Sequence, residues 1–546
     1  MKRRFIGLVL LITFVFQIGL LAQTVTKKGS PAMKAAEAIT ADQLKDYLYF
    51  IADDAMQGRD TPSAGLDVAA NFIAFNLKKW GVKPAGDTGS YFQRMWVIRK
   101  SADPTASSLV LNGQTLKYGD DFFGAADDGM ANAPIVFGGS GWMHKAKGID
   151  TLAGVDVKGK IVVLYGGSSP NGLPAGLTFN DLQSGKQGED WATPVQNAAM
   201  KGAVAIINIA SPRTQTNWAR ASQGTGGGVQ IENLRANQAG GATLPTVTLN
   251  QNAAKSLFDG EAVNPLTTAD AKAFAFSGNK SANITVKGKT TKIPTQNVVG
   301  MIEGSDPVLK KEMIVLSAHY DHVGVNPNAP GDDKIWNGAD DDGSGTVAVL
   351  SIAEALAKSA KKPKRSMVFL WVAGEEKGLL GSEYFAKFPT PNVPMKDVVT
   401  NINIDMIGRS RKADNTDPRD KDLSGEHEIF VIGSNMMSTT LGRVTDTVNK
   451  GYLNMTYNLK YDDPKDTNRF FFRSDHFNFA VNGVPAVFFF NGVHRDYHGA
   501  GDHPDKIDYA RMQKISRTIF LTMWELGDLK ERPKVDKELP PELRQR

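Results

Sequence analysis

The sequence contains no cysteine. This absence excludes disulfide bonds, zinc sites with cysteine ligands, iron–sulfur clusters and a cysteine nucleophile. Charge of one sign is not concentrated either, because 63 lysines and arginines are interleaved with 58 aspartates and glutamates and no long basic stripe occurs. The net charge of +5 is small for 546 residues, so we expect no nucleic-acid partner.

Several signatures of catalysis are missing as well. The chain has no HExxH motif, no G-x-S-x-G nucleophile elbow, no P-loop and no Rossmann glycine pattern. Each of these patterns places particular groups around a zinc ion, a reactive serine or a phosphate. Any catalytic chemistry in this chain must therefore depend on other residues.

Long apolar runs are rare, and the clearest one lies at the N-terminus. Lys2, Arg3 and Arg4 precede an almost uncharged run at 5–21, and Ala22 follows it. This order predicts a cleaved signal peptide, residues 1–22, and an exported protein that is secreted or periplasmic. An uncleaved anchor is the alternative, since the run of about 17 residues is at the lower limit for spanning a bilayer. After cleavage we expect no stable membrane insertion.

The remaining chain has the composition of a globular protein, with 41% hydrophobic and 22% charged residues, and its length predicts two to four domains. Residues 130–285 contain short β-type runs separated by glycine-rich loops. Residues 286–530 alternate apolar runs with helical segments. Such near-continuous apolar runs predict an α/β fold with a mostly parallel central sheet and helices on both faces. The charged, proline-rich tail at 531–546 is predicted to be disordered.

Histidines and carboxylates follow the apolar runs of the α/β region, where open sheets of this kind bind ligands. Without cysteine, such side chains suit a catalytic zinc or similar divalent ion. Two metals fit the number of donors better than one, with one carboxylate shared between them. The predicted donors are His319, Asp340, Glu376, Asp405 and His498.

Two acidic residues beside these donors have predicted roles of their own. Glu375 precedes a donor and suits a general base that takes a proton from water. Asp321 suits an acceptor for the second ring N–H of His319. Alone, a Glu-Glu pair also fits a solvated surface, and an aspartate run also fits a helix cap. The remaining histidines of this region that we expect to be structural, or to support the donors from outside, are His322, His476, His494 and His503.

The ordered motifs resemble those of the secreted di-zinc aminopeptidases, a family that includes bacterial leucyl aminopeptidases, aminopeptidase Y and plasma glutamate carboxypeptidase. The resemblance implies a zinc-exopeptidase (phosphorylase/hydrolase-like) catalytic domain at 286–530, with its N-terminal part at 36–129. Residues 130–285 look like the protease-associated domain that is often inserted in this family. The motifs are His319-x-Asp321, Gly338-Ala-Asp340-Asp-Asp-Gly-Ser-Gly345, Gly374-Glu375-Glu376-x-Gly378, Asn403-Ile-Asp405-Met-Ile-Gly-Arg409, Ser474-Asp475-His476 and Tyr497-His498.

The resemblance also implies a role for each residue. His319 and Asp405 would hold one zinc, Glu376 and His498 the other, and Asp340 would bridge the two. Glu375 would be the base, and Tyr497 would hydrogen-bond the developing oxyanion. The expected cofactor is two Zn²⁺ per chain, with Co²⁺ or Mn²⁺ as alternatives. The implied protein is an exported zinc-dependent aminopeptidase with peptide substrates.

Two alternatives stay open at this point. A carboxypeptidase or dipeptidase of the glutamate-carboxypeptidase type would need cations for the terminal carboxylate of its substrate, and Arg409, Arg411 and Arg473 are candidates. A non-catalytic binding protein on the same fold is the other alternative. A one-zinc glutaminyl cyclase is disfavoured because His319 is present.

Overall fold

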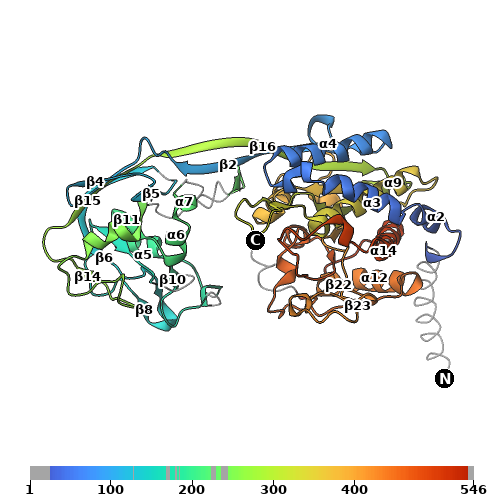
Figure 1. Cartoon of the computed structure of the whole chain (residues 1–546). Helices are drawn as coiled ribbons and strands as arrows, with labels where there is room; N and C mark the ends of the chain where they lie inside the picture. Colours follow the sequence, from blue (N-terminus) through green and yellow to red (C-terminus); the bar gives the residue numbers. More distant parts are fainter. Residues whose placement is uncertain are drawn as a thin grey trace, which may run out of the picture. The chain divides into compact units, whose positions relative to one another are not determined.

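The computed structural model divides into two compact units, and Figure 1 colours the chain along its sequence. One unit contains Met1–Trp96 and Ile293–Arg546, and the other is Val97–Lys292. The structure describes residues 25–126, 128–167, 172–178, 181–183, 185–222, 229–234 and 244–538. The predicted signal peptide, 1–22, lies outside these residues.

A mixed sheet forms the centre of the first unit, with the strand order β2-β16-β20-β17-β21-β24-β22-β23. Strand β17 pairs in parallel with β20 and β21, and β21 pairs in parallel with β24. Antiparallel pairs join β16 to β20 and β22 to β24. The parallel centre confirms the predicted fold class. The strands are β2 (Phe92–Ala102), β16 (Gly288–Ile302), β17 (Met313–His319), β20 (Ser366–Val372), β21 (Val398–Ile404), β22 (Glu428–Ile432), β23 (Thr456–Asn458) and β24 (Ala486–Phe490).

Several helices of the first unit begin at polar caps. The Thr40 hydroxyl accepts the N–H of Gln43 at the start of α3, and the Ser63 hydroxyl accepts the N–H of Leu66 at the start of α4. Each bond satisfies a backbone donor that the first helical turn leaves free. The helices are α2 (Pro31–Glu37), α3 (Ala41–Ile51), α4 (Ala64–Lys79), α9 (Gly345–Lys358), α10 (Leu380–Lys387), α11 (Ser434–Met437), α12 (Thr439–Gly451), α13 (His476–Ala480) and α14 (Tyr509–Asp528).

These helices cover both faces of the sheet, as predicted. Side chains alternate between the two faces along a strand, so neighbouring residues of β20 point in opposite directions. Val368 packs in one core cluster with Phe385 of α10 and Phe479 of α13. The indole N–H of Trp371, which has the opposite parity, donates to the Thr346 carbonyl of α9 at 3.0 Å. The sheet is therefore buried on both sides, which explains its near-continuous apolar runs.

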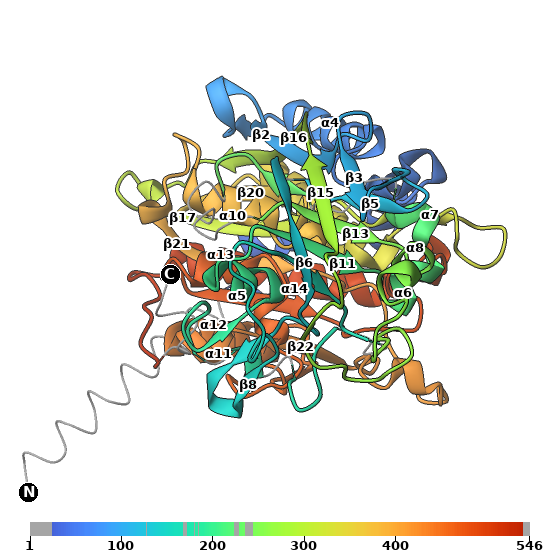
Figure 2. The ribbon, with the colours of Figure 1, turned by 90° about the vertical axis from the view of Figure 1, so that its left-hand side faces the viewer.

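The second unit is built on a separate sheet in which β15, β6, β9, β11 and β13 are successive neighbours; Figure 2 shows several of them side by side. The unit begins at Val97, so it includes 97–129, which the sequence analysis assigned to the first domain. Its identity as a protease-associated domain stays a prediction. The strands of this sheet are β3 (Ser108–Leu111), β4 (Gln114–Leu116), β5 (Phe122–Gly124), β6 (Gly129–Phe137), β9 (Ile161–Leu164), β11 (Ala205–Ile209), β13 (Thr246–Leu249), β14 (Phe274–Ala275) and β15 (Ser281–Val286).

Part of the tail that was predicted to be disordered makes contacts with the first unit. Val535 packs against an aromatic core cluster, and the Asp536 carboxylate accepts the N–H of Thr439 at 2.8 Å. Residues 539–546 lie outside the described part of the chain. Within the described ranges, no helix has both the length and the apolar character that crossing a membrane requires.

Candidate metal centre

Four strands of the first unit deliver histidines and carboxylates at their carboxyl ends. Strand β17 ends at His319, Glu375 and Asp405 follow β20 and β21, and His498 lies in the loop after β24. These four strands are parallel neighbours, so their carboxyl ends meet at one edge, where open α/β sheets bind ligands. A fifth segment, η7 (Ala339–Ser344), leads into α9 and brings a run of aspartates to the same edge.

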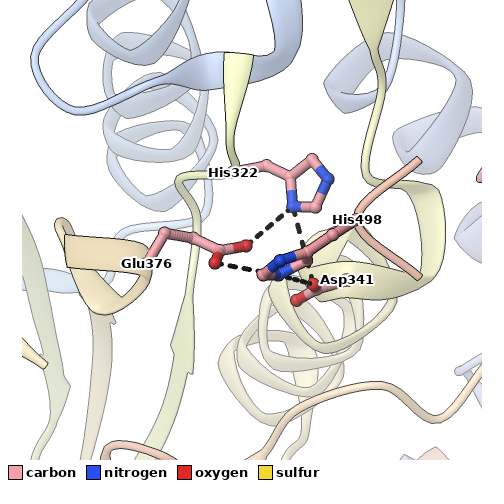
Figure 3. A group of neighbouring side chains, drawn as sticks. All are labelled: His322, Asp341, Glu376 and His498. Carbon is pink, nitrogen blue, oxygen red and sulfur yellow. Dashed lines mark ion pairs between the residues drawn. The ribbon is translucent and has the colours of Figure 1, made fainter. Parts of the chain in front are cut away.

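One group of four side chains at this edge could hold a metal ion: His322, Asp341, Glu376 and His498. Figure 3 shows all four converging on one point. Nδ1 of His322 lies 2.9 Å from Glu376 Oε1 and 3.6 Å from Asp341 Oδ2. Nε2 of His498 lies 3.0 Å from Glu376 Oε2 and 3.1 Å from Asp341 Oδ2.

A second group contains His319, Asp341 and Asp405. Nε2 of His319 lies 3.3 Å from Asp341 Oδ1 and 3.6 Å from Asp405 Oδ1. Oδ1 of Asp341 thus faces this three-donor group, and Oδ2 of Asp341 faces the four-donor group described above. The Ser474 hydroxyl donates to Asp405 Oδ2 at 2.7 Å, which leaves Oδ1 of Asp405 directed toward His319.

The donor types and their spacing fit zinc. Imidazole nitrogens and carboxylate oxygens bind zinc at about 2.0–2.2 Å, so two donors on one tetrahedral ion lie roughly 3.3 Å apart. The ion-pair distances within both groups, 2.9–3.6 Å, bracket this value. Buried polar atoms normally have a partner, yet several donor atoms here have no hydrogen-bond partner among the described residues. They are His319 Nε2, His322 Nδ1, Asp341 Oδ2, Glu376 Oε1 and His498 Nε2.

Opposite charges in this buried place change the acid–base behaviour of the donors. Burial by itself lowers the pKa of His498, but the carboxylates of Asp341 and Glu376, 3.1 and 3.0 Å from its Nε2, raise it to about 10. Burial favours a higher pKa for Asp341, yet the imidazoles of His319 and His498, 3.3 and 3.1 Å away, hold that pKa well below its usual range. A zinc ligand must be a neutral imidazole, so metal binding has to release the proton that His498 otherwise keeps.

Asp340, the predicted shared carboxylate, lies in neither group. Its Oδ1 accepts the N–H of Gly408 at 2.7 Å, and its Oδ2 lies 3.2 Å from Nε2 of His494. Asp341 occupies the shared position instead, so the sequence prediction is corrected by one residue. The reason is the local turn: Asp341 and Asp342 depart from helical backbone angles, and adjacent aspartates therefore point to different places.

Glu375 lies beside the three-donor group, with Oε2 3.9 Å from His319 Nε2. Burial raises the pKa of Glu375 well above its usual range; His319 opposes this shift and the Asp405 carboxylate reinforces it. Asp321 lies behind both residues, and its Oδ1 accepts the N–H of Glu375 at 3.3 Å. Nδ1 of His319 lies 3.1 Å from the Asp321 carbonyl oxygen and 3.7 Å from its carboxylate, so the nearer acceptor is the backbone rather than the predicted side chain.

Tyr497 lines a pocket at the same edge. Its ring stacks on the His498 ring with centroids 4.0 Å apart. Burial raises the pKa of Tyr497, and the carboxylates of Asp341 and Glu376 raise it further, so the hydroxyl keeps its proton and can donate a hydrogen bond. The other lining residues are Asp341, Glu375, Asp405, Met406, Phe470, Arg473, Phe488, Phe490 and Val493.

Neither His322 nor Asp341 was among the donors that the sequence pattern predicted. His322 was expected to lie outside the donor set, but the turn after β17 brings it to the same centre as His498. Its spacing of three residues from His319 was the available signal, although this spacing fits a structural histidine equally well. His476, by contrast, is buried with its ring stacked on Phe488 at 4.8 Å, as expected for a structural residue.

Known protein families include one whose sequence pattern matches this region. The sequence pattern of Peptidase family M28 matches residues 297–523, which contain every donor described above. The match places the candidate donors inside a segment that is similar to peptidases of this family. The match agrees with the peptidase class that the motifs predicted.

Individual relatives are distant. The chain is 26% identical over 281 residues to a probable leucine aminopeptidase 2 of Aspergillus oryzae, covering 48% of this chain and 50% of that protein. It is 27% identical over 274 residues to a probable zinc metalloprotease of Phaeosphaeria nodorum, covering 43% and 53%. The chain therefore spans about half the length of these curated relatives.

Solved structures also resemble the chain. An aminopeptidase from Aneurinibacillus sp. strain AM-1 matches with a TM-score of 0.49 and 17% identity, covering 93% of this chain and 98% of that one. A zinc aminopeptidase from Bacillus subtilis matches with a TM-score of 0.48 and 18% identity, covering 92% and 98%.

The shared position of Asp341 leads to a test by substitution. We expect Asp341→Asn to lower the content of both metals, because one carboxylate serves both groups and an amide binds zinc weakly. Asp340→Asn is the matched control, and it should keep its metal because Asp340 contacts neither group. Metal analysis of the dialysed proteins, with circular dichroism to verify folding, measures both. The assignment fails if the folded Asp340 variant loses metal while the Asp341 variant retains it.

Proposed function

We propose that this protein is an exported metallo-exopeptidase that hydrolyses the N-terminal peptide bond of peptides, with two zinc ions and Glu375 as the general base. The observation that carries the proposal is the pair of donor groups that share Asp341 while Glu375 lies beside one of them. A carboxylate shared between two metals, next to an unshared carboxylate, supports hydrolysis assisted by two metals.

Two residues of this chain have separate roles in the proposed hydrolysis. Zinc, when bound, polarises the scissile carbonyl and lowers the pKa of water to about 7. The raised pKa of Glu375 suits it to accept a proton from the attacking water and to deliver it to the leaving amine nitrogen as the C–N bond breaks. The proton on the Tyr497 hydroxyl is available to the oxyanion that forms on the carbonyl oxygen.

The charge and polarity of the pocket favour an aminopeptidase. Glu375 lines it without belonging to either donor group, so its carboxylate stays available to a free N-terminal ammonium group when metal occupies Asp341 and Asp405. The apolar lining residues would accept an apolar first side chain. The leucine aminopeptidases among the relatives agree with this preference.

The carboxypeptidase alternative finds less support. Arg409 is paired with Asp496 at 2.9 Å, and the Arg411 guanidinium donates to the Lys421 carbonyl at 3.3 Å. Of the three candidate arginines, Arg473 lines the pocket. A carboxypeptidase of this type would need a cluster of cations for the terminal carboxylate of its substrate, and a single arginine does not supply one.

A panel of peptides tests the proposed activity. Purified protein loaded with zinc should cleave peptides with a free N-terminal amine and an apolar first residue, and it should spare their N-acetylated counterparts because these lack the ammonium group. Release of the first amino acid, followed by mass spectrometry, is the measurement. Cleavage of N-acylated peptides from the carboxyl end would show a carboxypeptidase, and metal binding without any cleavage would show a binding protein.

The assignment of the base has its own test. Glu375→Gln keeps the size of the side chain but cannot accept a proton, so we expect kcat to fall by about 10²–10⁴-fold with unchanged zinc content. Glu376→Gln is the matched comparison and should lose metal, because its carboxylate belongs to the four-donor group. Single-turnover kinetics and metal analysis separate the two effects. A near-normal chemical step in Glu375→Gln would rule out this base.

Export is proposed on the basic and apolar start of the chain, with cleavage near Ala22. Sequencing of the mature N-terminus from the producing cell is the measurement. A mature chain that still begins at Met1 would favour the membrane-anchor alternative.

A further inference from the structure

We infer that His322 is a fourth protein donor to one metal, so that the two metal positions of this centre are unequal. This inference rests on the proposed function. The position formed by His322, Asp341, Glu376 and His498 is closed by protein side chains. The position formed by His319, Asp341 and Asp405 has three donors and remains open to water or substrate.

The location of His322 supports a direct role at the metal. Its side chain is fully buried, and both ring nitrogens have no hydrogen-bond partner among the described residues. Such a histidine normally has a partner. Nδ1 faces the same two carboxylates that Nε2 of His498 faces, and the two rings meet edge to face, with centroids 5.6 Å apart. The two imidazoles thus approach one point from different directions (Figure 3).

The surrounding backbone holds the ring of His322 in place. The backbone N–H of His322 donates to the Arg59 carbonyl at 3.2 Å. Gly338 lies against the ring: a Cβ at this position would come within 2.5 Å of His322 Cγ, and the φ of +60° there also favours glycine. The close approach of a glycine and the bond to Arg59 together fix the imidazole toward Glu376.

The difference in the number of donors assigns different tasks to the two positions. Zinc sites with four protein ligands are closed and structural, whereas catalytic sites keep one position open. Glu375 lies beside the three-donor group and 3.9 Å from His319 Nε2. The base therefore lies at the open position, and the closed position holds its ion more tightly. Metal should fill the closed position first.

X-ray absorption spectroscopy of the wild-type protein tests this order without any substitution. Protein stripped with a chelator receives one equivalent of zinc, and the imidazoles bound per zinc are counted. We expect two, from His322 and His498. With two equivalents the average should fall to 1.5, because the open position adds His319 alone. One imidazole per zinc at the first equivalent would overturn the inference.

A variant gives a second measurement. His322→Gln should weaken the tighter of two zinc affinities by more than about 100-fold, the upper range for residues that only support a ligand from outside. Titration of the stripped protein with zinc against a chromophoric chelator measures the affinity, and His427→Gln, at an exposed position, is the control. Unchanged tight binding in a folded His322→Gln protein would overturn the inference.

Failure of this inference differs from failure of the proposed function. A protein that cleaves free-amine peptides but binds its first zinc through one imidazole keeps the function and loses the inference. A protein that binds its first zinc through two imidazoles but cleaves no peptide keeps the inference and loses the function.

Discussion

The centre depends on the cost of gathering carboxylates in a buried place. Asp341, Glu376 and Asp405 lie close together among three imidazoles, and like charges this close repel strongly where water is scarce. Two histidines offset part of this repulsion while they keep their protons, as the raised pKa of His498 shows. A divalent cation offsets more of it, so binding of metal to the folded state should stabilise the fold. The repulsion between these buried carboxylates therefore favours binding of a cation at this edge of the sheet.

Buried hydrogen bonds from distant segments hold the turns of the centre in place against this repulsion. The Asp502 carboxylate accepts the backbone N–H groups of Asp340 and Asp341 at 3.0–3.1 Å, which fixes the turn that aims the shared carboxylate. The fully buried Arg59 guanidinium donates to the carbonyls of Ile51, Tyr320, Asn337 and Gly338 at 2.7–2.9 Å. It thereby ties the N-terminal segment to the loops after β17 and before α9. A cation that binds only carbonyls also places positive charge beside the carboxylates.

Periodicity and strand order were enough to predict the α/β fold and the sheet edge that holds the centre. The apolar runs marked the strands, and parallel strands bring their carboxyl ends together. The sequence could not show which residue of a polar run faces inward, because that direction depends on the backbone angles of single residues. Asp340 and Asp341 are chemically identical, and the turn that separates their directions depends on Asp502, far along the chain. His322 was missed for the same reason, since its ring is placed by Arg59 and Gly338 rather than by its own neighbours.

The second unit is an insertion in the sequence of the first unit. The chain crosses from the first unit to the second within β2 and returns within β16, and these strands are neighbours in one sheet. An insertion whose ends are already adjacent adds little loop-closure entropy to the host domain. Every donor described above comes from the first unit, so changes in the second unit need not disturb the metal geometry. A protein built this way can vary the unit between β2 and β16 while the candidate metal donors of the first unit keep their places.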